Sequence, residues 1–145
     1  MTDWMAIARA EKGVKERPGD VDNPRILEYL STVNIPANNC HDEVPWCAAF
    51  VNWVLRQAGL EGTGSAAARS FLRWGVKMSE PKQGCVVILS RGSHGWQGHA
   101  GFYMGQRAGY VIVLGGNQNN EVSEKMYEIN KVLGYRWPAE EVKKK

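Results

Sequence analysis

The stretch Asp-Glu-Val-Pro-Trp-Cys-Ala-Ala-Phe-Val-Asn-Trp-Val-Leu, residues 42–55, places a cysteine at the start of an apolar run with helical spacing. This spacing predicts a helix that begins at Cys47 and ends near Ala58, because Gly59 follows. The first N–H groups of a helix lack partners and carry the positive end of its dipole. Both effects favour a thiolate, so the pattern predicts a nucleophile at Cys47; the alternative is a small, buried, apolar cysteine.

A nucleophilic thiol needs a base, and the chain contains three histidines. His41 and His94 lie in polar, loop-like sequence, whereas His99 opens the strand-like run Gly-His-Ala-Gly-Phe-Tyr-Met-Gly, residues 98–105. A strand holds its first side chain firmly, and the glycines beside it allow a backbone or a substrate to come close. We therefore predict that His99 is the base; the alternative is a surface histidine at a strand end.

A third polar side chain should orient the imidazole. The strand predicted over residues 110–114 is followed by Gly-Gly-Asn-Gln-Asn-Asn, residues 115–120. An amide oxygen that accepts the second ring N–H of His99 would fix its tautomer. Asn117 is the first polar residue after the strand and is our first choice, with Gln118 second, although the same residues also suit an ordinary turn.

The order of these residues resembles the CHAP and NlpC-type superfamily of papain-like cysteine peptidases and amidases, which cut peptidoglycan. The resemblance is closest to a small phage and prophage branch and extends from about Trp4 to Trp137. It is carried by five motifs: Glu-x-Gly-x-Lys-Glu-x-Pro-Gly (11–19), Asn-Pro-x-Ile (23–26), Asp-Glu-Val-Pro-Trp-Cys-Ala (42–48), Gly-His-Ala-Gly (98–101) and Leu-Gly-Gly-Asn-Gln (114–118). It implies Cys47 as nucleophile, His99 as base and Asn117 as the orienting residue. Cys85 stands where the superfamily usually has aspartate.

The order of the predicted elements indicates an α+β fold with an antiparallel sheet, since helices come first and short strands follow. The resemblance implies that this fold is papain-like, with N-terminal helices packed on a C-terminal sheet. A chain of 145 residues can bury a core of its own, so we expect a single catalytic domain over residues 1–145. Lys143–Lys145 should form a flexible basic tail. The helices are expected at 2–15, 23–30, 47–58 and 65–75, and the strands at 85–89, 100–104, 110–114, 121–127 and 132–137.

Composition argues against several classes of protein. The three cysteines form no C-x-x-C pair, which argues against a disulfide framework and a zinc site, and we predict neither a metal nor another cofactor. Asp42 and Glu43 alone are too few ligands for calcium. The formal charge of +3 comes with no nucleic-acid-binding motif. No apolar run reaches the roughly 20 residues of a membrane span, and no signal peptide is recognisable, so we expect synthesis in the cytoplasm.

The resemblance implies an endolysin-like peptidoglycan hydrolase. Its target would be an amide bond in the stem peptide, the cross-bridge or the muramoyl-L-alanine linkage. Trp46, Trp96 and Gln118 are predicted to bind substrate, although a core position is an equal alternative for Trp46. We expect a monomer that reaches the wall after release by a partner holin. The alternatives are a secreted antibacterial effector with the same chemistry and a catalytically inactive wall-binding or virion module.

Overall fold

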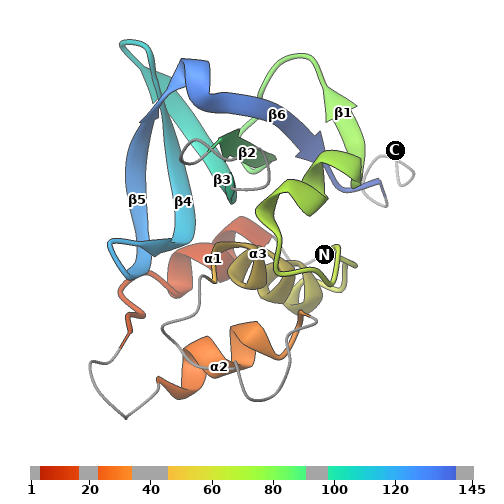
Figure 1. Ribbon diagram of the computed structural model, residues 1–145, viewed down its shortest axis with the longest axis vertical. Helices are drawn as coiled ribbons and strands as arrows, with labels where there is room; N and C mark the ends of the chain where they lie inside the picture. Colours follow the sequence, from red (N-terminus) through yellow and green to blue (C-terminus); the bar gives the residue numbers. More distant parts are fainter. Residues whose placement is uncertain (1–3, 17–22, 34–45, 91–97, 140–145) are drawn as a thin grey trace.

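A six-stranded antiparallel sheet and three α-helices make up most of the described chain (Figure 1). The computed structural model describes residues 4–16, 23–33, 46–90 and 98–139. The strand order is β1-β6-β2-β3-β4-β5, and every pairing between neighbours is antiparallel. The elements are α1 (Trp4–Ala10), α2 (Pro24–Leu30), α3 (Cys47–Gln57), η2 (Ala68–Arg73), β1 (Val76–Met78), β2 (Val86–Ser90), β3 (Gly98–Arg107), β4 (Tyr110–Gln118), β5 (Glu121–Glu128), η3 (Ile129–Lys131) and β6 (Val132–Trp137). The predicted α+β class, with helices before the sheet, is confirmed.

The two faces of the sheet contribute to different apolar clusters, because successive side chains of a strand point to opposite sides. Val86, Ile88 and Phe102 lie in the cluster that includes the helices. Leu89 and Val113 belong to a second cluster together with neighbouring side chains of β3 and β6. The sheet is therefore buried on the helical side and curls around a smaller core on the other.

Helix α3 is the central helix of the fold. It packs on β3 and β4 and is also in contact with α1 and α2. All nine residues from Cys47 to Leu55 are buried, so the helix has no solvent face over this length. We predicted an apolar stripe with Trp53 on its flank. The structure instead buries Trp53 against Tyr29 of α2, with ring centroids 5.1 Å apart.

Two helix ends follow the predicted chemistry. The Asn23 side chain accepts a hydrogen bond of 2.9 Å from the Arg25 N–H, and Pro24 occupies the first position of α2. After α3, Gly59 has a φ of +80°, and Leu60 donates to the Leu55 carbonyl at 2.8 Å. This arrangement is a Schellman cap, in which a left-handed glycine ends the helix. Helix α3, which starts at Cys47, thus has a well-defined end at Gly59.

One predicted helix was wrong in detail, and one strand was missed. The fourth helix, expected over 65–75, is the 3₁₀-helix η2 over Ala68–Arg73, where Ser65 accepts from the Ala67 N–H before the helix begins. Strand β1 was not predicted, because three residues paired only with β6 leave little pattern in a sequence. Of the helices among the described residues, none is long and apolar enough to cross a membrane.

Candidate active site

Cys47 is the first residue of α3 and is almost completely buried, with 4% of its surface exposed. The first main-chain bond of the helix joins the Phe50 N–H to the Trp46 carbonyl at 3.0 Å. The N–H groups of Cys47, Ala48 and Ala49 therefore have no acceptor within the helix. The Ala48 N–H interacts with the Cys47 sulfur, as does the Ala100 N–H from β3. The sequence prediction that the thiol lies at a helix N-terminus is confirmed.

The surroundings of Cys47 favour the thiolate. Burial alone raises the pKa of this thiol, because a charged group is poorly solvated in the interior. The charge of His99, a hydrogen bond with its ring and the two backbone N–H groups act in the opposite direction and outweigh burial. The pKa of Cys47 is therefore below that of an ordinary cysteine. A lowered pKa is what a cysteine nucleophile requires near neutral pH.

His99 lies near the start of β3 and is also buried, with 5% of its surface exposed. Its Nε2 atom is 2.9 Å from Oε1 of Gln118, at the end of β4. With Nε2 engaged by the amide, Nδ1 is the ring nitrogen that remains for the Cys47 thiol. The residues therefore form a line, from thiol to imidazole to amide.

The orientation of the Gln118 amide determines the tautomer of His99. The NH₂ group of Gln118 donates to the Ser123 carbonyl at 2.6 Å and to the Val113 carbonyl at 3.2 Å. Only the nitrogen end of an amide can donate to two carbonyls, so the oxygen must face the ring. That oxygen accepts from Nε2–H, which leaves Nδ1 of the neutral imidazole free to accept the thiol proton. Gln118 is 1% exposed, so water does not compete for these bonds.

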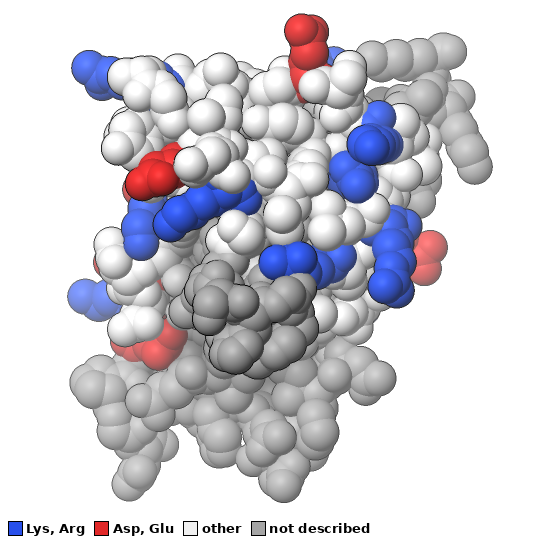
Figure 2. All heavy atoms as spheres, turned by 45° about the horizontal axis from the view of Figure 1, so that its top comes forward, with Lys and Arg blue, Asp and Glu red and all other residues white. Residues whose placement is uncertain are grey.

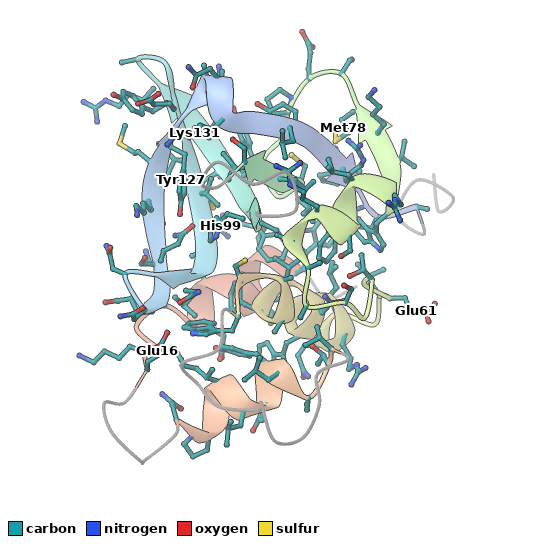
Figure 3. All side chains as sticks on the ribbon, in the orientation of Figure 1. Glu16, Glu61, Met78, His99, Tyr127 and Lys131 are labelled. Carbon is teal, nitrogen blue, oxygen red and sulfur yellow. The ribbon has the colours of Figure 1, made fainter. Side chains whose placement is uncertain are left out.

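Tyr127 of β5, which Figure 3 shows beside His99, and Gly115 of β4 both lie close to the imidazole and the Gln118 amide. The Tyr127 ring lies over His99 with centroids 5.2 Å apart, and its hydroxyl donates to Oε1 of Gln118 at 3.2 Å. A Cβ atom on Gly115 would lie 2.9 Å from Oε1 of Gln118 and 3.4 Å from Nε2 of His99. Sequence reasoning missed both residues. The glycine pair after the strand was the signal that a backbone passes close to another group.

The structure corrects the order of preference for the orienting residue. Gln118, our second choice, contacts the ring, whereas Asn117 is partly exposed and lines a cavity beside His99. The reason is that β4 continues to Gln118 through an irregularity between Gly115 and Gln118. Asn117 has a φ of +59° at this irregularity, so the expected alternation of sides is lost. The same burial of Gln118 contradicts its predicted role in binding substrate.

Trp46 does not line a cleft, contrary to the prediction. It is fully buried and packs against Tyr29, and its indole N–H donates to Oε2 of Glu16 at 2.9 Å. Gly116 makes this position possible, since a Cβ there would lie 2.6 Å from the indole ring. Trp46 thus belongs to the core beneath the start of α3. Trp96, the other predicted substrate-binding tryptophan, lies outside the described residues.

The cavity beside His99 has a volume of about 330 Å³. Besides His99 and Tyr127, its lining is polar and includes two lysines and three asparagines: Lys125, Lys131, Asn117, Asn119 and Asn120. Figure 3 shows Lys131, Tyr127 and His99 following one another toward the helices. His99 therefore lies in the wall of a polar depression that could admit part of a substrate.

The described part of the chain contains no group of three or more histidine, cysteine, aspartate or glutamate side chains suited to a metal ion. Asp42 and Glu43, which we considered for calcium, lie outside that part, as do Cys40, His41 and His94. The absence of a cofactor therefore stays a prediction. Cys85, the other buried cysteine, lies in the second apolar cluster rather than beside His99.

Residues 39–117, more than half of the chain, match the CHAP domain family. Among curated protein sequences, none matches the chain. Several solved structures share its fold, including an endolysin and a protein of the NLP/P60 family. The endolysin LysIME-EF1 aligns over 94% of this chain and 63% of its own, with a TM-score of 0.60 and 15% identity. A protein of the NLP/P60 family from Staphylococcus aureus, described as similar to a lipoprotein, aligns over 92% of this chain and 39% of its own, with a TM-score of 0.51 and 12% identity. The chain thus spans less than two thirds of either protein's length.

Proposed function

The chain belongs to the CHAP domain family, and from this premise we propose that it is a peptidoglycan hydrolase that cleaves an amide bond by cysteine chemistry. The line of contacts from Cys47 to His99 to Gln118 carries the proposal. It supplies a thiol with a lowered pKa, a base of defined tautomer and a fixed acceptor for the second ring N–H. The endolysin among the structural neighbours supports the choice of substrate.

The first half of the reaction would form an acyl-enzyme. The Cys47 thiolate attacks the amide carbonyl, while His99 holds the thiol proton as imidazolium. N–H groups at the start of α3 stabilise the negative oxygen of the tetrahedral intermediate. The imidazolium then gives its proton to the nitrogen of the leaving amine, and the C–N bond breaks.

The second half would restore the enzyme with water. His99, now neutral, accepts a proton from a water molecule that attacks the thioester carbonyl. The C–S bond breaks, the thiolate leaves and the carboxylic acid product departs. Throughout the cycle Gln118 accepts from Nε2–H, in both the neutral and the charged form of the ring. Its task is to keep Nδ1 directed at the sulfur.

The experiment is to incubate purified cell walls with the protein and to identify the released muropeptides by mass spectrometry. We expect new amino and carboxyl termini at one amide bond, which also identifies the bond as one of the stem peptide, the cross-bridge or the muramoyl linkage. The Cys47→Ala variant serves as the control for contaminating hydrolases. Walls that stay intact with the wild type would contradict the function, and EDTA should leave the rate unchanged.

The route to the wall is a separate part of the proposal. A single catalytic domain made in the cytoplasm and freed by a holin would act on the wall from inside the cell. Expression with and without a holin tests this route, because lysis should require both proteins. Lysis from outside by the added protein alone would support the effector alternative.

A further inference from the structure

The cavity beside His99 is lined by two positively charged side chains, Lys125 of β5 and Lys131 of η3. Among the residues that the structure describes, no acidic side chain lines it. Glu124 lies next to Lys125 in the chain, but it forms an ion pair with Lys12 at 2.8 Å. Successive residues of a strand point to opposite faces, which explains why Glu124 does not enter the cavity. The two ammonium groups therefore share the cavity with no carboxylate from the described part of the chain.

Among the described residues, neither lysine has an anionic partner. Lys125 lies over the Tyr127 ring, with Nζ 5.4 Å from its centroid. A cation–π contact of this kind positions an ammonium group without neutralising it. The ion pairs found among the described residues involve Lys12 and Arg25, not Lys125 or Lys131.

The neutral groups of the cavity also suit an anionic ligand. Asn117, near the end of β4, and Asn119 and Asn120, in the turn before β5, line the same cavity. Their amide NH₂ groups can donate hydrogen bonds to an anion. On the face in Figure 2, Lys and Arg side chains are more widespread than acidic ones, which lie toward its edges. An anionic substrate would be attracted to such a face.

From these observations we infer that the cavity binds a carboxylate of the peptide substrate, next to the bond that Cys47 attacks, with Lys125 and Lys131 as the recognition residues. The inference rests on the proposed function, because it takes His99 as the base of an amide hydrolase. Stem peptides contain free carboxylates, one on the glutamyl residue and one at the chain terminus. A carboxylate held beside His99 would fix which amide carbonyl reaches the thiolate.

The test measures binding separately from cleavage. The Cys47→Ala protein is titrated calorimetrically with a lysine-type muramoyl tetrapeptide and with two forms of it, amidated at the glutamyl carboxyl or at the C-terminus. We expect one amidation to weaken binding roughly tenfold, the loss of one charge-assisted contact. Changing both Lys125→Gln and Lys131→Gln in this background should weaken binding of the free acid by at least as much and remove the difference between the peptides.

Lys77→Gln is the matched control, because Lys77 is exposed on β1 and does not line the cavity. Replacing the two lysines by arginine should preserve the preference for the free acid. Equal binding of all three peptides, or a double glutamine variant that binds like Lys77→Gln, would overturn the inference. Wild-type protein that releases no product from walls would overturn the proposed function instead, and the binding data would still stand.

Discussion

Cys47 and Cys85, the two cysteines among the described residues, are both buried, but their pKa values shift in opposite directions. Burial raises the pKa of Cys85 to about 11, whereas the pKa of Cys47 is lowered although it too is buried. Cys85 lies in the second apolar cluster, near the Tyr103 and Tyr135 rings, which supply no positive charge. Cys47 has the His99 ring and two backbone N–H groups around its sulfur. The difference teaches that a charged partner, not the depth of burial, decides the direction in which the pKa of a thiol shifts here.

Removing the two thiols one at a time should give the largest difference in lysis rate between variants. Cys47→Ala should lower the initial rate of wall turbidity loss on the order of 10⁴-fold or more, since the nucleophile is gone. Cys85→Ala should retain most of the activity, as should Cys40→Ala. Melting temperatures show whether each variant is folded, and Cys47→Ser provides a second variant of nearly native size. Substantial lysis by folded Cys47→Ala would remove the basis of the comparison.

Removing the imidazole should make Cys47 resemble Cys85. His99→Ala should lower the rate by about 10³-fold or more, because both proton transfers pass through this ring. It should also raise the pKa of Cys47, since burial then acts with less opposition. The pH dependence of iodoacetamide labelling, followed by peptide mass spectrometry, measures this pKa directly. In the wild type, labelling of Cys47 should persist to lower pH than for an ordinary cysteine, and Cys85 should stay unlabelled near neutral pH.

His94→Ala is the matched control for that experiment. It should change neither the lysis rate nor the labelling profile of Cys47 by more than a few-fold. Equal losses at His94 and His99 would require a different base. A wild-type labelling profile that depends on pH like that of a free thiol would contradict the lowered pKa of Cys47.

The sequence predicted that Cys47 and His99 lie together because the signals for these two positions are local. A helix start after Pro45-Trp46 and a histidine at the start of a strand can be recognised from a few neighbouring residues. The orienting residue could not be chosen in this way, because the irregularity after Gly115 changes which side chain faces His99. Only the paired strand β5 reveals that Gln118, rather than Asn117, points inward.

Trp46 illustrates the same limit in the core. Its burial depends on α2, which supplies Tyr29, and on β4, which passes close to it at Gly116. Both contacts join segments that are distant in the chain. A tryptophan next to a nucleophile has the same local sequence whether it lines a cleft or lies beneath the helix. The helix order and the strands β2 to β6 were predictable from periodicity, whereas β1 and the 3₁₀ geometry of η2 were not.

An intermediate effect is expected from the amide that holds the ring. Gln118→Ala should lower the rate roughly 10- to 100-fold, the loss of one hydrogen bond to a group that becomes charged during the reaction. Asn117→Gly is the matched variant, because glycine accepts the φ of +59° while the side chain is removed. The ratio of the two rates, measured at several pH values, tests whether Gln118 or Asn117 orients the His99 ring. Gln118→Ala should also alter the labelling profile of Cys47, which a purely structural loss of stability would not do. A larger loss from Asn117→Gly would restore Asn117 as the orienting residue.

The smallest effect should come from the contact beneath the start of α3. Glu16→Ala removes the acceptor of the Trp46 N–H, which lies in the core directly before Cys47. An unpaired buried donor costs about 1–3 kcal/mol, so the melting temperature should fall by several degrees. Glu16→Gln keeps an acceptor oxygen and should lose less stability.

Because Trp46 supplies the carbonyl that accepts the first main-chain bond of α3, we expect Glu16→Ala to cause a modest loss of activity as well, smaller than that of Gln118→Ala. Thermal unfolding of both variants measures the loss of stability, and their lysis rates measure the loss of activity. If Glu16→Ala left the melting temperature unchanged, the Glu16–Trp46 bond would not help to hold the helix start, and the reactivity of Cys47 would depend on His99 and the backbone N–H groups alone.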